Sequence, residues 1–305
     1  MTNQASDDLK GSPERFGYEW GAYAEILPEH EEQFRRWTAP LSADDWRGKR
    51  FLDVGCGMGR NSYWPLKYGA ASGVAIDLDE RSLESARRNL KSFPNMQILQ
   101  ASACDLPFEE NFDLVFSIGV IHHLPNPERA LKRMACAAKP GGRVLIWVYG
   151  RENNGWLVSV LNPLRRMLFS RLPVGWTHHL SLYPAVLLWM LLRLGMQPIE
   201  YFRLIAKFDF SHLRAIVFDQ MLPRISHYWP RETVAGMMAD AGLEDIRLIW
   251  VNQMSWSAIG TRPARTRAAD ASRIVSRSRA LKRRMEVEPV ARFLHQTETA
   301  ERERG

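Results

Sequence analysis

Between residues 46 and 150 the chain alternates short apolar runs with longer polar stretches, and this alternation restricts the fold more than any other feature. The apolar runs have the length of buried strands, and the polar stretches carry apolar residues at helical spacing. Such alternation is typical of βα units around a parallel sheet. The runs that we expect to form strands are RFLDVG, ASGVAID, NMQILQAS, FDLVFSIG and RVLIWVYG.

The alternation stops near Asn153. Residues 156–228 are rich in Leu, Trp, Met and Arg and show no βα pattern. Order returns with RETVAGMMADAG, a helix that we expect to end at Gly242, followed by LEDIRLIWVN and MSWSAIGTRP as two strands in hairpin relation. The sequence therefore predicts a doubly wound α/β domain with a helical insertion after its fifth strand.

These boundaries suggest five segments. They are an N-terminal helical lid segment (1–45), a ligand-binding core (46–150), a helical cap insertion (151–228), the last helix and two strands of the core (229–264) and a basic tail (265–305).

The first expected strand runs into a glycine-rich loop, DVGCGMGR, which suits a ligand lying close to the backbone. Gly55, Gly57 and Gly59 follow G-x-G-x-G, and Arg60 stands where the dinucleotide motif G-x-G-x-x-G has its third glycine. The second strand ends at Asp77, 22 residues after Gly55, where a carboxylate can accept both hydroxyls of a ribose. Taken alone, the loop also fits a tight turn without a ligand.

Four blocks that keep their order over about 100 residues carry a resemblance to a known family: DVGCGMGR, GVAIDLD, SACDLPF and FDLVFSIGVIHHLPNPERALKRMACAAKPGG. Together they resemble the class I S-adenosylmethionine-dependent methyltransferases. The resemblance implies a Rossmann-like seven-stranded sheet with an antiparallel last strand, and S-adenosylmethionine as the cofactor.

The resemblance also implies which residues hold the cofactor. Those expected around its methionine part are Asp53, Gly55, Cys56, Gly57 and Gly59, with Arg60 as a partner for the carboxylate; those around the ribose are Asp77 and Leu78; those around the adenine are Ser102 and Ala103; and those near the sulfonium are Ser117, Ile118 and Gly119. Ser102 stands where members of this family often have an aspartate, so the adenine assignment is the weakest of the set.

Aromatic residues ahead of the first strand, in FGYEWGAYAE, suggest a lid. Trp20 and Tyr23 lie three apart on one helical face. One interpretation is that they pack this segment onto the sheet domain. The other is that they cover the ligands, with Trp20 at the cofactor and Tyr23 at the acceptor. An aromatic face at the cofactor would favour its cationic sulfonium.

Histidines are the first candidates for proton transfer, because their unperturbed pKa lies near neutral pH. His122 and His123 follow the fourth strand, where they have either a structural or a catalytic role, and His227 is a third candidate. Asp219 and Tyr228 in the insertion are candidates for acceptor binding, against the alternative of a polar surface loop.

Three scattered cysteines and adjacent histidine pairs do not match a zinc-binding spacing, so we expect reduced thiols and no bound metal. The N-terminus MTNQASDDLK has no apolar run behind a basic start, which favours a cytoplasmic protein.

The window LYPAVLLWMLLRLG (182–195) is too short to span a bilayer. It is either a buried cap or oligomer contact, or part of a peripheral membrane contact through residues 156–196, at the inner face of the membrane. The sequence does not reveal the oligomeric state.

The formal net charge of +7 comes largely from the tail 265–305, which holds eleven basic and six acidic residues and so contributes 11 − 6 = +5. Such a tail is typically solvated, and contact with RNA or an anionic membrane is the alternative.

As the function we expect methyl transfer from S-adenosylmethionine to a small-molecule or lipid-linked acceptor, first of all O-methylation of a sugar or secondary metabolite. The alternatives are a membrane-associated lipid or quinone methyltransferase, an RNA methyltransferase that uses the basic tail, and a binding protein of this fold without turnover.

Overall fold

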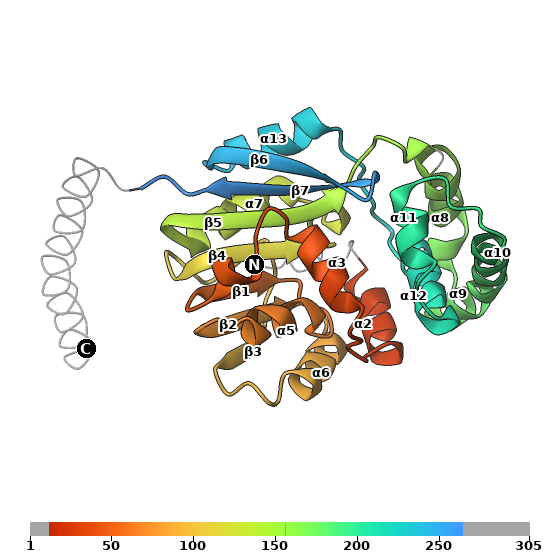
Figure 1. Ribbon diagram of the computed structural model, residues 1–305, viewed down its shortest axis with the longest axis horizontal. Coiled ribbons are helices and arrows are strands. Elements are labelled where there is room, and N and C mark those ends of the chain that lie inside the picture. Colours follow the sequence, from red (N-terminus) through yellow and green to blue (C-terminus); the bar gives the residue numbers. More distant parts are fainter. Residues whose placement is uncertain (1–11, 156, 265–305) are drawn as a thin grey trace, which may run out of the picture. The chain divides into compact units, whose positions relative to one another are not determined.

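The computed structural model describes residues 12–155 and 157–264, and its centre is one seven-stranded sheet in the order β3-β2-β1-β4-β5-β7-β6 (Figure 1). β7 is antiparallel to both of its neighbours, and the other paired strands run parallel. The expected seven-stranded sheet with an antiparallel last strand is confirmed. The strands are β1 (Arg50–Val54), β2 (Ser72–Asp77), β3 (Met96–Gln100), β4 (Phe112–Ile118), β5 (Ala138–Tyr149), β6 (Glu244–Val251) and β7 (Ser255–Thr261).

Helices cover both faces of the sheet. The helices that connect or follow the strands are α5 (Arg60–Lys67), α6 (Glu80–Asn89), the 3₁₀ turn η2 (Ile121–His123), α7 (Pro127–Ala137) and α13 (Arg231–Asp240). Ahead of β1 stand α2 (Pro13–Ala22), α3 (His30–Trp37) and α4 (Ala43–Trp46). The tail 265–305, for which we expected a solvated basic segment, lies outside the described residues.

The central strands are apolar on both faces because both faces are covered. On one face Leu52 of β1 and Val115 of β4 belong to a core with α7 and α13. On the other face Phe51 and Phe116, one residue away, belong to a core with α3, α4 and α5. Successive residues of a strand point to opposite faces, so each central strand contributes to both cores.

β5 begins earlier than the sequence suggested. We expected the strand RVLIWVYG, which starts at Arg143 after the segment Pro140-Gly-Gly. Instead Ala138 already pairs with Phe112, and the register then shifts before Arg143 pairs with Leu114. The irregularity spans the Pro-Gly-Gly segment, which shows that a break in local propensity can be absorbed inside a strand as a bulge.

Between β5 and α13 the chain is almost entirely helical. These elements are the π-helical turn η3 (Leu157–Leu161), α8 (Asn162–Met167), the 3₁₀ turn η4 (Phe169–Arg171), α9 (Val174–Leu180), α10 (Leu182–Arg193), α11 (Glu200–Ile205) and α12 (Phe210–Met221). They gather at one end of the sheet (Figure 1), with a small core of their own that includes Leu192, Leu204 and Leu213. The five-segment division expected from the sequence stays a prediction.

A buried arginine connects α2 to these helices. Arg15 is 4% exposed, and its guanidinium donates to the carbonyl oxygens of Phe169, Leu172 and Leu222 and to the hydroxyl of Thr177, at 2.9 to 3.1 Å. Four acceptors spread over two segments of the insertion therefore converge on one side chain of the N-terminal helix.

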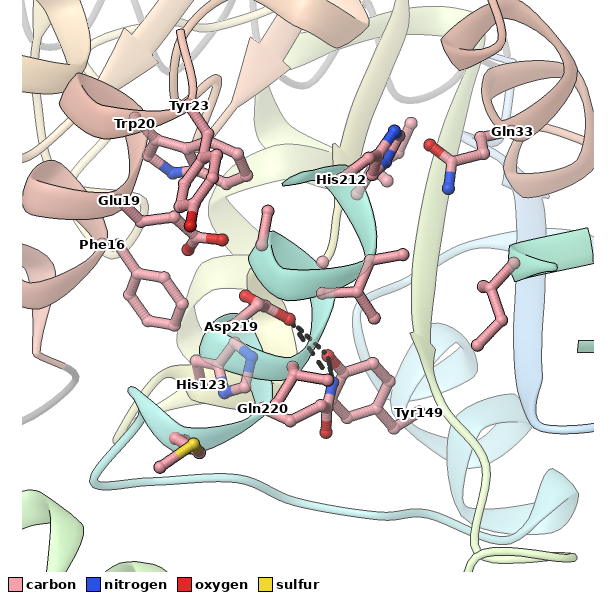
Figure 2. Close-up of a pocket in the computed structure, with 18 of the residues that line it drawn as sticks. Phe16, Glu19, Trp20, Tyr23, Gln33, His123, Tyr149, His212, Asp219 and Gln220 are labelled. Carbon is pink, nitrogen blue, oxygen red and sulfur yellow. Dashed lines mark hydrogen bonds between the residues drawn. The ribbon is translucent and has the colours of Figure 1, made fainter. Parts of the chain in front are cut away.

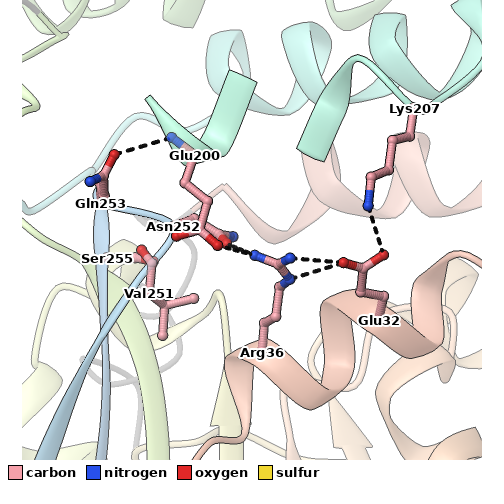
Figure 3. A network of polar contacts seen from close by, with 8 residues as sticks. All are labelled: Glu32, Arg36, Glu200, Lys207, Val251, Asn252, Gln253 and Ser255. Atoms are coloured by element: carbon pink, nitrogen blue, oxygen red, sulfur yellow. Dashed lines mark hydrogen bonds and ion pairs between the residues drawn. The ribbon is translucent and has the colours of Figure 1, made fainter. Parts of the chain in front are cut away.

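A second connection joins α3, α11 and the turn between β6 and β7 (Figure 3). Arg36 bonds Glu32 in its own helix, Glu200 of α11 at 2.5 Å and the Asn252 side chain at 2.9 Å. Gln253 accepts the backbone N–H of Glu200 at 3.1 Å. This network holds the start of α11 against the antiparallel end of the sheet.

α2 also rests on the N-terminus of α6, and a glycine permits the approach. A Cβ atom at Gly17 would lie 1.9 Å from Oδ1 of Asp79. Asp79 caps α6 by accepting the Arg81 N–H, and the Arg81 side chain donates in turn to Asp79 and to the Glu14 carbonyl. Any side chain at position 17 would therefore displace a helix cap.

Gly17→Ala is expected to lower the free energy of unfolding by about 1 kcal/mol, the cost of a lost N-cap, despite the better helix propensity of alanine. Gly21→Ala is the matched control in the same helix, because a Cβ there has no atom within 4 Å, and it should leave stability unchanged or raise it by up to about 1 kcal/mol. Urea unfolding compares the two variants. Equal effects would show that α2 does not depend on its contact with Asp79.

Candidate functional site

A cavity of about 1300 Å³ lies at the carboxyl ends of β1, β2 and β4, where open α/β sheets bind their ligands. One wall is formed by the loops after these strands. The opposite wall is formed by α2, α3 and the helices α8 to α12. Cavities that hold one small molecule have about 300–1,000 Å³, so this one has room for a cofactor and a second ligand.

The glycine loop forms the floor beneath α2. Gly57 has φ +54°, and a Cβ there would lie 2.9 Å from Nε1 of Trp20. The indole of Trp20 thus rests directly on the loop backbone, with its ring in the cavity (Figure 2). Trp20 therefore both packs α2 onto the sheet domain and lines the cavity, and its contact with the cofactor stays a prediction.

Asp77 stands at the end of β2 with its carboxyl group in the cavity wall. Its oxygens accept the backbone N–H groups of Gly57, Leu78 and Asp79 at 2.8 to 3.1 Å. Burial raises the pKa of this carboxyl, and the three hydrogen bonds oppose the rise. Asp77 therefore fixes the loop and presents an acceptor to a ligand at the same time.

The other residues predicted for the cofactor divide into two groups. Those that line the cavity are Gly55, Cys56, Leu78, Ser102, Ala103, Ile118 and Gly119. Those behind the wall are Asp53, Gly59 and Ser117. Among the second group, Asp53 accepts the Ser62 hydroxyl at 2.7 Å and Ser117 donates to the Val54 carbonyl, so both support the loop from below.

Arg60 lines the cavity between two aromatic rings. Its guanidinium carbon lies 5.6 Å from the ring centre of Trp20 and 5.3 Å from that of Trp37. Among residues 12–155 and 157–264 no carboxylate forms an ion pair with it. A buried cation held by aromatic faces and without an anionic partner is suited to bind a ligand carboxylate.

The three candidate histidines have different surroundings. Only His123 lines the cavity; His122 is fully buried behind it, and His227 does not reach it. The Nδ1–H of His123 donates to the Ile225 carbonyl at 2.8 Å, which leaves Nε2 as the acceptor nitrogen. Burial lowers the pKa of His123 to about 3 and that of His122 well below its usual value, so both rings are neutral.

A polar group from β5 and α12 lies beside His123 (Figure 2). The Tyr149 hydroxyl donates to Oδ2 of Asp219 at 3.3 Å, and the Gln220 amide donates to both at 2.8 and 3.4 Å. Tyr228 stacks on Tyr149 with ring centres 5.3 Å apart. Asp219 and Tyr228, both predicted for the acceptor, therefore lie together in the cavity wall.

Tyr23, the remaining acceptor candidate, lines the cavity, and its hydroxyl is hydrogen-bonded to Nε2 of His178 at 3.0 Å.

The sequence interpretation missed Glu19, Tyr149 and Gln220. Glu19 is 2% exposed and lines the cavity from α2. Its signal was a single acidic residue inside the aromatic stretch FGYEWGAY, where a carboxylate has no role in packing. In the described part of the chain, no cluster of three His, Cys, Asp or Glu side chains is placed to hold a metal ion.

Comparison with known proteins identifies the family. A model described as "Methyltransferase domain" matches residues 52–146. The ubiquinone biosynthesis O-methyltransferase of Azoarcus sp. is 34% identical over 170 residues, which cover 52% of this chain and 68% of that protein. This chain belongs to the class I S-adenosylmethionine-dependent methyltransferases. The enzyme of the same name from Idiomarina loihiensis is 30% identical, over 47% of this chain and 60% of its own length.

Solved methyltransferase structures are similar at low identity. An O-methyltransferase family protein from Burkholderia thailandensis has a TM-score of 0.49 at 15% identity, covering 77% of this chain and 57% of that chain. A SAM-dependent methyltransferase from Aquifex aeolicus has a TM-score of 0.48 at 16% identity, covering 77% and 94%.

The residues at the sheet edge fit S-adenosylmethionine. Gly55 and Gly57 line the cavity beside the indole of Trp20, so a ligand can contact the loop backbone there. Below the loop, Oδ1 of Asp53 is buried without a partner among the described residues, and burial raises the pKa of this carboxyl to about 7. With Asp77 on one side and Arg60 on the other, the wall offers acceptors for hydroxyl and ammonium groups and a cation for a carboxylate.

Asp77→Ala is expected to weaken S-adenosylmethionine binding by about tenfold or more, because a hydrogen bond to a charged group contributes about 1.5–3 kcal/mol and the loop loses three such bonds. Isothermal titration calorimetry measures the change. Asp44→Ala, which removes a carboxylate with an 85% exposed side chain, is the control and should bind like the wild type. Unchanged affinity in Asp77→Ala would place the cofactor elsewhere.

Proposed function

We propose that the protein transfers the methyl group of S-adenosylmethionine to a hydroxyl of a phenolic acceptor that carries an apolar, isoprenoid-like tail, as in a quinone precursor. The observation that carries the proposal is the continuity of the cavity. It runs from the glycine loop, past Asp219 and Tyr149, to an apolar wall of leucines on the insertion helices that includes Leu161, Leu164, Leu187 and Leu191.

The polar and apolar parts of the cavity suit the two parts of such an acceptor. When bound, the cofactor supplies an electrophilic methyl group on a sulfonium. The group of Tyr149, Asp219 and Gln220 offers a donor and acceptors for ring hydroxyls. An apolar tail gains about 25 cal/mol for each Å² that it buries among the leucines. In this proposal, residues 151–228 are the acceptor cap.

The quinone alternative suits these findings better than the sugar that we expected first. The relatives described above are named for ubiquinone biosynthesis, and ubiquinone is a ring with an isoprenoid tail. A sugar presents a hydroxyl on nearly every carbon, and each one that is buried needs a hydrogen-bonding partner. The leucine-rich wall offers few hydrogen-bonding groups for such hydroxyls. The alternative of RNA methylation depended on the tail 265–305, which lies outside the described residues.

Purified protein with labelled S-adenosylmethionine is expected to methylate a farnesylated catechol and not a hexose, because only the first has a tail for the leucine wall. Product formation is followed by mass spectrometry. The short catechol without the farnesyl group is the matched control, and it should show a raised KM. Preference for the hexose, or equal KM values for the two catechols, would contradict the proposed acceptor class.

A long-tailed acceptor resides in a membrane, and the insertion has a face suited to one. Large apolar side chains are exposed there on α8, α9, α10 and the turns beside them: Val160, Leu164, Met167, Leu168, Trp176, Tyr183, Leu187, Met190, Leu194 and Met196. Several of them, including Leu164, Tyr183 and Leu187, also line the cavity, so the cavity opens on this face. Acceptor entry from a bilayer then needs no passage through water.

The charge of this segment favours an anionic bilayer. Residues 157–199 contain four arginines and no aspartate or glutamate. Arg171 and Arg193 are exposed, and Arg193 lies over the ring of Trp189. Basic and aromatic residues around an apolar face are typical of helices that lie at a membrane surface. No helix in residues 12–155 or 157–264 has both the length and the apolar character needed to cross a bilayer.

We expect the protein to float with vesicles that contain phosphatidylglycerol and less with phosphatidylcholine alone. Met190→Glu should lower the bound fraction about tenfold or more, since it removes an inserted side chain worth about 1.5–3 kcal/mol and adds a charge. The control is Leu99→Glu, because Leu99 is similarly exposed but lies on the edge strand β3. Equal loss in both variants, or none in either, would argue against this face.

A further inference from the structure

The cavity contains a second carboxyl group that the proposed function has not used. Glu19 projects from α2 toward Asp219 on α12 (Figure 2). It is 2% exposed, and its Oε2 atom has no hydrogen-bonding partner among the described residues. A buried, unpartnered carboxyl oxygen at a ligand cavity is costly unless a ligand completes its hydrogen bonding.

Asp219 is held so that only one of its oxygens is engaged. Tyr149 and Gln220 both donate to Oδ2, and no described residue donates to Oδ1. Tyr149 is itself fixed between two rings, with His122 at 3.9 Å and Tyr228 at 5.3 Å between ring centres. The carboxylate therefore keeps one orientation, with an acceptor oxygen available on the cavity side.

We propose that Asp219 and Glu19 act as a carboxylate–carboxylic acid pair across the cavity, in which Asp219 is the base that removes the proton of the acceptor hydroxyl and Glu19 is a protonated positioning residue. The inference rests on the proposed methyl transfer. The proton passes to Oδ1 of Asp219, the O–H electron pair stays on the oxygen that bonds the methyl carbon, and the C–S pair stays on sulfur.

The electrostatics support this assignment of roles. Burial raises the pKa of Asp219 to about 6, opposed by Arg165, by the Tyr149 hydrogen bond and by Arg60. Burial and the charge of Asp219 also raise the pKa of Glu19, opposed by Arg60. Hydrogen bonds from Tyr149 and Gln220 favour the charged form of Asp219, whereas Oε2 of Glu19 has no such donor among the described residues, so the negative charge of the pair is assigned to Asp219 and the proton to Glu19.

His123 is the competing base, and its surroundings make it weaker. The same burial lowers the pKa of its imidazole to about 3, because the charged form of a histidine is the protonated one. A base with a pKa near the working pH transfers protons more effectively than one far below it. The tyrosines that face the pair, Tyr149 and Tyr201, have pKa values raised by burial and stay protonated.

The test measures kcat/KM against pH with S-adenosylmethionine and the farnesylated catechol. Wild-type activity is expected to rise through about pH 6 and then level off, because Asp219 acts in its ionised form. Asp219→Asn should lower kcat about 100-fold or more and lose this limb, with unchanged cofactor affinity by calorimetry. His123→Gln should keep the limb. Loss of the limb in His123→Gln, or its survival in Asp219→Asn, would overturn the proposal.

Glu19 is tested by its two replacements. Glu19→Gln keeps a neutral donor and should keep most of the activity, whereas Glu19→Ala should raise KM for the catechol. Asp240→Asn and Glu84→Gln, at exposed positions on α13 and α6, are the matched controls. A Glu19→Ala variant with wild-type KM would remove Glu19 from the pair.

A measurement without acceptor separates this inference from the proposed function. Carbon-13 NMR of the intact protein, with the Asp219 and Glu19 resonances assigned by their loss in Asp219→Asn and Glu19→Gln, should show that both carboxyl groups titrate above the usual range, beside those of Asp53 and Asp77. In Asp219→Asn the Asp219 resonance is lost and the Glu19 carboxyl titrates lower, because the charge of Asp219 that raised its pKa is gone. If the wild type methylates no catechol but shows this pattern, the acceptor proposal fails and the pair stands; absence of the pattern refutes the pair.

Discussion

The cavity depends on the buried guanidinium of Arg15. A charged group taken out of water is costly, and Arg15 offsets the cost with four hydrogen bonds to neutral acceptors. Because three of these acceptors are backbone carbonyls at Phe169, Leu172 and Leu222, the interaction requires the insertion to be folded in one arrangement. Without it, α2 would be held to the insertion by fewer contacts, among them the Tyr23–His178 hydrogen bond and the Glu14–Arg224 ion pair, and the wall that contains Glu19 would be less firmly positioned.

The two walls of the cavity are positioned by different physical means. At the sheet edge, backbone hydrogen bonds set the glycine loop and Asp77, and the strands that carry them are buried on both faces. The wall made by α2 and α8 to α12 depends on side chains, chiefly Arg15 and the network around Arg36. The first wall is fixed by the sheet architecture, so specificity for the acceptor is free to vary in the second.

The sequence predicted the sheet, the glycine loop and Asp77 because each is encoded locally. Strand periodicity, turn glycines and the spacing between Gly55 and Asp77 are all read within a few dozen residues. Asp219 and Tyr228 were proposed for the acceptor as polar residues in an apolar segment, and both line the cavity, although their role stays a prediction. Glu19 was missed because its partner lies 200 residues away in the sequence, and only the folded insertion brings the two together. The positions of the adjacent histidines were still harder to predict, because the 3₁₀ turn η2 places His123 at the cavity and His122 behind it.

In the turn between β6 and β7, the residues that would minimise backbone strain differ from those that attach the insertion to the sheet. Asn252 and Gln253 both have positive φ, 51° and 59°, a conformation that glycine adopts without strain and glutamine does not. Glycine at position 253 would relax the hairpin, yet it would remove the side chain that holds the start of α11, and glycine at 252 would remove a partner of Arg36. The backbone of the hairpin is therefore more strained than it would be with glycine at these two positions. The same two side chains attach the helical wall to the sheet through their hydrogen bonds to Arg36 and to the start of α11.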